Sequence, residues 1–162
     1  MGTHFSGTSD EIRALNVYIK LSRASESVSY RINRHLKDHN LSTSQFGVLE
    51  ALLHLGPMCQ SELATKILKS TGNLTMVVDH LEERGMVERR RESSDRRFVT
   101  VHLTEAGRVL IAGIFVEHAA GVVREIGVLE PDEQVQLAML CRKLGRGVEQ
   151  NRLDLSSEKG PI

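Results

Sequence analysis

One short stretch constrains the fold of this chain more than any other, the run from Lys69 to Gly85. Ser70 or Thr71 can supply an N-cap oxygen, and Gly85 can adopt the left-handed conformation that ends a helix. Between these ends, apolar residues recur at the i, i+3, i+4, i+7 spacing of a helix with one buried face; they are Leu74, Val77, Val78 and Leu81. The sequence therefore predicts a short amphipathic helix, bounded on both sides, whose polar face serves another purpose.

Two β-prone runs, residues 86–91 and 98–103, follow this helix and are joined by a polar loop. Val99, Val101 and Leu103 alternate, as in a strand with one buried face. A short helix followed by a hairpin predicts a winged helix-turn-helix, with the hairpin as its wing. Guanidinium groups suit phosphate contact and entry into a narrow minor groove, and arginines outnumber acids in this window; they are Arg84, Arg89, Arg90, Arg91, Arg96 and Arg97.

The preceding segments complete the motif. Ser42 and Gln45 fit a capping box that opens an apolar helix, which Gly56 and Pro57 close. Residues 61–69 are then expected to form the first helix of the helix-turn-helix. The predicted winged helix-turn-helix core spans about residues 42–103.

The capped helix, the segments Arg84-Gly85-Met86-Val87 and Asp95-Arg96-Arg97, and the run from Leu103 to Gly107 resemble the MarR family of bacterial transcription regulators. The resemblance implies a homodimer in which each winged helix-turn-helix reads one half of a palindromic operator in double-stranded DNA. It also implies repression that an unknown small-molecule effector relieves. The expected fold is mainly α with a small β-hairpin wing, as a single MarR-like domain over residues 1–162.

The predicted DNA-contacting residues divide between the recognition helix and the wing. Because family members often carry arginine where this chain has Met76, base reading is expected to depend on Asn73, Thr75 and His80, with Met76 touching a thymine methyl. The resemblance also implies that Asp95 braces an arginine directed into the minor groove. The full predicted set is Ser70, Thr71, Gly72, Asn73, Thr75, Met76 and His80 in the helix, and Arg89, Arg90, Arg91, Asp95, Arg96 and Arg97 in the wing. Asp79 is interpreted as orienting a wing arginine.

Long helices are predicted at both ends, over about residues 10–40 and over 104–150 with a break near Pro131. Residues 105–126 are apolar around more of the helix than one narrow stripe, so most of this surface must be buried. One winged helix-turn-helix core cannot bury all the terminal helices, and pairing with a second copy of the chain would bury the remainder. They are therefore interpreted as dimerisation helices. The serine-rich middle of the first helix fits either a close helix–helix crossing or the floor of an effector pocket.

Charge and composition narrow the function further. Lysine plus arginine equals aspartate plus glutamate at 21 each, which disfavours a broad non-specific nucleic-acid binder but not one whose positive charge is gathered in a wing. We expect no membrane span, no signal peptide and a cytoplasmic location. No catalytic motif or cofactor loop is present, so the chain is not expected to be an enzyme or to need a cofactor.

Several residues leave alternatives open. Cys59 stands where an N-cap oxygen is usual, so it is either an oxidant-sensing thiol favoured by the helix dipole or a small residue tolerated at a cap. Cys141 is expected to be a buried hydrophobe. His35 and His39 lie one turn apart, but without further ligands they predict no metal site. A redox regulator using Cys59 and a winged-helix protein-interaction module remain the alternative functions.

Overall fold

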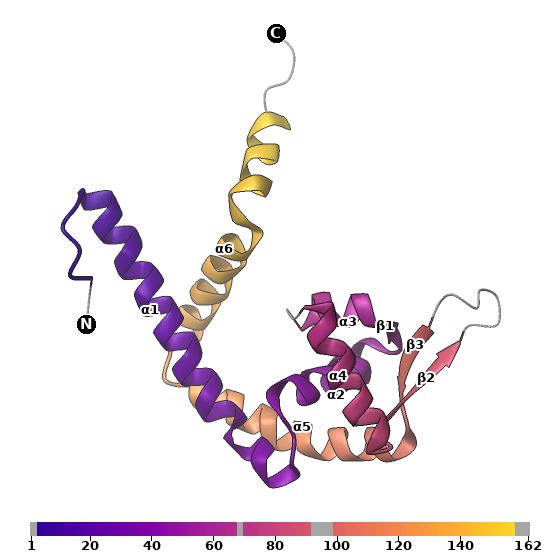
Figure 1. Ribbon diagram of the computed structural model, residues 1–162. Helices are drawn as coiled ribbons and strands as arrows, with labels where there is room; N and C mark the ends of the chain where they lie inside the picture. The colour runs from indigo at the N-terminus through magenta and orange to yellow at the C-terminus, as the bar shows by residue number, and fades with distance from the viewer. Residues whose placement is uncertain (1–2, 68–69, 92–98, 158–162) are drawn as a thin grey trace. The chain divides into compact units, whose positions relative to one another are not determined.

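The computed structural model describes residues 3–67, 70–91 and 99–157, apart from the side chains of Thr71 and of residues 147–157. Contacts divide the chain into two compact units, Met1–Val122 and Val123–Ile162. Ten helices and strands occur in the described residues (Figure 1): α1 Ser9–Ile32, the 3-10 helix η1 Asn33–His39, α2 Thr43–Leu55, β1 Met58–Cys59, α3 Gln60–Lys66, α4 Thr71–Glu83, β2 Val87–Arg91, β3 Val99–Leu103, α5 Glu105–Ile126 and α6 Pro131–Ser157.

The predicted amphipathic helix is α4, and its apolar stripe is buried as expected. Leu74, Val78 and Leu81 are fully buried, and Val77 packs against the same core. Gly85 follows the helix with φ of +67°, the left-handed conformation that its sequence position predicted. Ser70 is the N-cap residue, although its side chain makes no capping hydrogen bond.

The core of the first unit gathers one or two large side chains from each surrounding element. Leu49 and Leu52 come from α2, Leu63 from α3, Val101 from β3 and Ile111 from α5, and all are essentially inaccessible to solvent. The α2 helix starts at the predicted capping box, in which the backbone N–H of Gln45 donates to Ser42 Oγ at 3.1 Å. This core fixes α4 against α2 and α3, so its polar face is directed outward.

The wing is part of a three-stranded antiparallel sheet in the described residues, in the order β1-β3-β2. Val87 pairs with Leu103 and Arg91 with Val99, which confirms the predicted hairpin. The strand β1, in which Met58 pairs with Val101, was not predicted. Two residues are too few to show a strand period, so only the partner strand reveals β1.

The first predicted helix is wrong in one respect, because it changes geometry instead of continuing to residue 40. The α-helix ends at Ile32, and a 3-10 turn continues to His39. The Nδ1 atom of His35 lies 2.7 Å from the carbonyl oxygen of Ile32, so a side chain uses a backbone acceptor there. Asn40, with φ of +53°, ends the segment. The tighter turn brings Leu36 into the core, whereas α1 itself buries no residue in the single chain.

The second unit holds the end of α5 and all of α6, which continues to Ser157 instead of ending near residue 149. The expected burial of Cys141 is wrong for the single chain, where this thiol is exposed. Its neighbours Leu140 and Leu144 are exposed as well, at 59% and 58%. Within its own unit, the apolar side of α6 is therefore uncovered.

Among the described residues, α5 is the one helix to be weighed against the prediction of no membrane span. By length and composition alone, α5 could cross a membrane, which is weak evidence. Its first half instead packs in the core of the first unit through Gly107, Ile111 and Ile114. A helix at the centre of a folded domain has the same length and apolar composition, so burial in this core explains the apolar sequence of α5.

Gly107 marks the closest approach between α5 and the start of the wing. A Cβ atom added there would lie 1.9 Å from the backbone oxygen of Met86, which cannot move without displacing the hairpin. We expect Gly107→Ala to lower the free energy of unfolding by about 3 kcal/mol, because an overpacked core must shift backbone. Thermal or urea unfolding measures the change.

Gly113 provides the matched control in the same helix. Nothing lies within 4 Å of the position its Cβ would take. Gly113→Ala should therefore raise stability by up to about 1 kcal/mol through helix propensity alone. Equal effects of the two substitutions would contradict the described contact between α5 and Met86.

Candidate nucleic-acid interface

The outward face of α4 carries the predicted reading residues on a helix held rigidly from behind. Leu74, Val78 and Leu81 anchor the inner face of α4. The residues predicted for the recognition helix lie on the opposite side and are exposed wherever the side chain is described; they are Ser70, Gly72, Asn73, Thr75, Met76 and His80. The side chain of Thr71 lies outside the described residues. Sequence periodicity thus predicted which face of α4 is exposed, and the rest of its own unit leaves that face uncovered.

Arg89 joins this helix to the wing through two carboxylates of α4. Its Nη2 atom donates to Asp79 Oδ1 at 2.5 Å, and its Nη1 atom donates to Glu82. The backbone N–H of Arg89 also donates to Glu82 Oε1 at 2.9 Å. Partial burial alone would lower the pKa of Arg89, but the bonds to Asp79 and Glu82 outweigh it and raise the pKa above its ordinary value.

This three-residue ion-pair network, called the Arg89 clamp below, confirms that Asp79 orients a wing arginine. It also neutralises two acids that would otherwise repel phosphates from the recognition helix. The Arg89 side chain is 24% exposed and its guanidinium already makes charge-assisted bonds to α4, so Arg89 lies where the wing meets this helix. The geometry favours a positioning role for Arg89.

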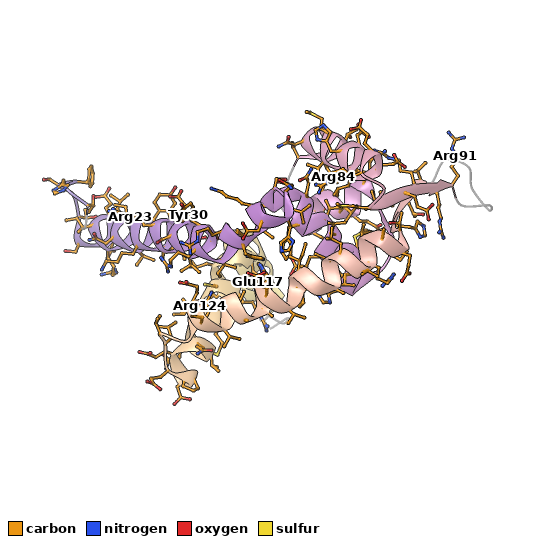
Figure 2. The ribbon with its side chains drawn as sticks, turned by 90° about the horizontal axis from the view of Figure 1, so that it is seen from below. Arg23, Tyr30, Arg84, Arg91, Glu117 and Arg124 are labelled. Atoms are coloured by element: carbon orange, nitrogen blue, oxygen red, sulfur yellow. The ribbon has the colours of Figure 1, made fainter. Side chains whose placement is uncertain are left out.

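The other described wing arginines lie farther along β2. Arg90 is exposed and its Nε donates to Glu88 Oε1 at 2.8 Å. Arg91 ends the strand, and its side chain projects away from the sheet (Figure 2). The predicted residues Asp95, Arg96 and Arg97 lie outside the described residues.

A second set of contacts fixes the end of α4. Arg84 Nη1 donates to the carbonyl oxygen of Asn40 at 2.8 Å, so it ties the helix to the end of η1. Thr104 Oγ1 donates to the Gly85 carbonyl at 2.7 Å and accepts from the Gly107 N–H at 3.0 Å. The recognition helix is consequently linked to η1 on one side and to the start of α5 on the other.

Cys59 ends β1 and is the N-cap residue of α3, the helix that precedes α4. Its backbone N–H donates to Glu62 Oε2 at 2.9 Å, and this bond lowers the pKa of Glu62. Its sulfur lies 2.9 Å from Ser61 Oγ. The cap is therefore completed mainly by Glu62, and a sensing role for the thiol stays a prediction.

A cavity of about 580 Å³ lies in the first unit, between the end of α1, α2, α3 and α5. Phe46, Ile67 and Val122 give it apolar walls, and the polar lining includes Ser29, Asn33, Glu50, His54, Lys66 and His118. Of the serine-rich residues in the first helix, Ser29 lines this cavity. The histidines were missed in the sequence because they are far apart and follow no motif.

His118 and His35 form an unusual pair at one side of this cavity. Their ring centroids are 5.4 Å apart, and Phe46 lies against both rings. Burial, and then the nearby His35, lower the pKa of His118. His35 Nδ1–H donates to the Ile32 carbonyl, and neither His35 Nε2 nor His118 Nδ1 has a hydrogen-bond partner in the described residues. Protonation of His118 is therefore disfavoured in the folded chain.

A rigid helix with an outward polar face, preceded by a short helix and followed by a hairpin braced against it, defines a winged helix-turn-helix DNA-binding protein. Comparison with known proteins gives the family. Residues 41–99 match the model of the MarR family. The transcriptional regulator YkoM of Bacillus subtilis is 38% identical over 133 residues, which are 82% of this chain and 86% of that protein. MhqR of Bacillus subtilis is 34% identical over 138 residues, 85% of this chain and 95% of that protein.

Solved structures of other transcriptional regulators share this fold. BpsR of Bordetella bronchiseptica, whose DNA binding is regulated by 6-hydroxynicotinic acid, superposes with a TM-score of 0.72 at 25% identity, over 90% of this chain and 98% of that one. AbsC of Streptomyces coelicolor shares the fold with a TM-score of 0.79 at 21% identity, over 90% and 99% of the two chains. The chain belongs to the MarR family and is a DNA-binding transcriptional regulator, not an enzyme.

The Arg89 clamp gives a direct prediction. Arg89→Gln leaves Asp79 and Glu82 without their cation, so it should lower the free energy of unfolding by about 1.5–3 kcal/mol, the range for hydrogen bonds to charged groups. It should also weaken DNA binding, because the recognition helix loses its brace to the wing. Urea unfolding and fluorescence anisotropy with duplex DNA measure the two effects.

Arg90→Gln is the matched control, since Arg90 is the next residue of β2 but is exposed and paired only locally. Its effect on unfolding should stay within about 0.5 kcal/mol. A clamp variant as stable as the Arg90 variant would contradict the role assigned to Arg89.

The lowered pKa of His118 predicts a pH dependence of stability. Because the pKa of His118 is lowered in the folded state, the unfolded chain binds this proton more readily. The free energy of unfolding therefore does not depend on His118 ionisation above about pH 6.5, the ordinary pKa of histidine, and it falls as the pH drops below that value. His118→Phe keeps a ring but removes the proton, so the loss of stability between about pH 7.5 and 5.5 should become smaller than in the parent protein. His4→Phe, at an exposed position, should leave that loss unchanged.

Proposed function

We infer that this regulator is a dimeric repressor that binds a palindromic operator and is released by a small-molecule effector. The observation that carries the proposal is the exposed polar face of α4, held at a fixed orientation to the wing by the Arg89 clamp. Such a helix fits the major groove, and the adjacent hairpin reaches the neighbouring backbone or minor groove. A repressor of this kind acts in the cytoplasm.

The proposed contacts follow the two surfaces. In the major groove, α4 presents Ser70, Thr71, Gly72, Asn73, Thr75, Met76 and His80. Along the wing, Arg90 and Arg91 contact phosphates, and we propose that Asp95, Arg96 and Arg97 form the minor-groove tip. Arg89 contributes by positioning the wing, since its guanidinium is already engaged.

Dimerisation is supported by apolar surface that the single chain leaves exposed. Within α1, Val17 and Tyr18 are 52% and 67% exposed, and α6 exposes Leu140 and Leu144. Two helices with uncovered apolar sides are expected to pair with a second copy of the chain. A two-fold dimer would place two recognition helices about 34 Å apart, one turn of DNA. We propose that both units, with helices near 10–40 and 104–150 as the interface, form one such dimeric domain.

The cavity near the histidine pair is the proposed effector site. Its volume of about 580 Å³ suits a one- or two-ring compound, and Lys66 on its wall can pair with a carboxylate. The regulation of the related BpsR by 6-hydroxynicotinic acid makes that compound the first to test.

Contacts in the first unit suggest how such a ligand would act on DNA binding. The cavity is bordered by Asn33 of η1, and the far end of η1 accepts the Arg84 bond that ties down the end of α4. A ligand that displaces η1 would therefore disturb the orientation of the recognition helix. If the spacing of the two recognition helices in a dimer no longer matches the operator, only one half-site can be bound, and the binding free energy of the other half-site is lost.

Selection from random duplexes with the purified protein tests this function. We expect enrichment of a palindrome with half-sites one turn apart, and binding that weakens steeply with salt because phosphate contacts release counterions. Replacing Arg90 and Arg91 by glutamine should reduce the slope of log affinity against log salt by about 2, roughly one per lost phosphate contact.

Arg108→Gln, at an exposed position on α5, is the control and should leave that slope unchanged. Absence of any enriched duplex, or binding insensitive to salt, would contradict operator recognition and favour a winged-helix protein-interaction module. Adding 6-hydroxynicotinic acid, or related ring acids, to the bound complex then tests release.

A further inference from the structure

The recognition helix of this protein carries no guanidinium or ammonium group. Between Thr71 and Glu83 the sequence contains no lysine or arginine, and its charged residues are Asp79, Glu82 and Glu83. The Arg89 clamp engages two of these three acids. Since bidentate arginine or lysine is the commonest reader of guanine in the major groove, α4 lacks the usual means of selecting G·C pairs.

A large apolar side chain occupies the centre of the reading face instead. Met76 is 61% exposed, although α4 has a buried face close by on which an apolar residue would be covered. Gly72 precedes it by one turn, and the space where a Cβ of Gly72 would point is empty to 4 Å. His80 follows it by one turn and is also exposed. No side chain at position 72 therefore obstructs approach to Met76 from the N-terminal side of α4.

The major groove offers one apolar feature that distinguishes a base, the C5 methyl group of thymine. A methionine side chain is flexible and polarizable, so it adapts well to such a contact. Asn73, one turn before Met76 and exposed on the same face, carries the amide that pairs with adenine N6 and N7. The two side chains are chemically matched to the two bases of A·T pairs.

We propose that Met76 determines operator specificity by contacting a thymine methyl, with Asn73 reading adenine, so that each half-site is specified by A·T pairs at the α4 contact. This inference rests on the proposed operator binding and adds the base class that the helix selects. Exposure of an apolar residue at the reading face then has a function, because DNA covers it.

The experiment starts with full-length protein and the duplex enriched by selection. Each thymine of one half-site is replaced in turn by uracil, which lacks only the C5 methyl, and the dissociation constant is measured by fluorescence anisotropy. Burial of one methyl predicts that a single position loses about three- to fivefold in affinity. The same replacement in both half-sites should lose roughly the square of that factor.

Two variants assign the effect to Met76. In Met76→Ala, uracil at the sensitive position should cause no further loss, because the partner of the methyl is gone. Met76→Leu keeps an apolar side chain and should retain the sensitivity. Met76→Arg should shift a repeated selection toward guanine at that position. Far-ultraviolet circular dichroism and thermal unfolding verify that each variant is folded.

The outcomes separate this inference from the function on which it rests. If the wild-type protein enriches an operator but tolerates uracil at every thymine, or if the uracil effect persists undiminished in Met76→Ala, the assignment of Met76 is overturned and operator binding stands. If no duplex is enriched, the proposed function itself fails. Should Met76→Ala not fold, the wild-type uracil series and Met76→Leu still decide the question.

Discussion

The arrangement of the DNA-binding surface depends on one ion-pair network, in which Arg89 of β2 is held by Asp79 and Glu82 of α4. The helix α4 ends at Glu83 and β2 begins at Val87, and the short segment between them does not by itself fix the angle between helix and hairpin. Backbone and side-chain hydrogen bonds from Arg89 restrict that angle, and the side-chain bonds are charge-assisted. The network also neutralises two carboxylates beside the face that we propose to approach phosphates, so one arginine sets both the orientation of the wing and the local charge.

The hydrophobic core and the hydrogen bonds at the ends of α4 complete this constraint. Leu74, Val78 and Leu81 fix the rotation of the helix about its axis, and that rotation decides which side chains face outward. Arg84 and Thr104 connect its end to η1 and α5. The cavity is bordered by Asn33 at the start of η1, and Arg84 bonds to Asn40 just after its end, so η1 connects the proposed effector site to the end of α4.

Much of this could be predicted from the sequence, because the relevant signals are local. The stripe of α4, the Ser42 capping box, the hairpin and the left-handed Gly85 all follow from periodicity, caps and turn chemistry. Other features depend on partners distant in sequence. The strand β1 exists only through its pairing with β3, the change of helix type at Ile32 accompanies a bond from His35, and the cavity gathers His54 and His118 from different helices. The exposure of Cys141 was mispredicted because an apolar helix pattern does not say which chain covers it.

A crystal structure of the protein with its selected operator tests the central claim most directly. The account predicts α4 in the major groove, the Arg89 clamp intact, and the Met76 side chain within about 4 Å of a thymine C5 methyl. An Arg89 released from Asp79 and Glu82 to contact phosphate, or an α4 lying outside the groove, would contradict it.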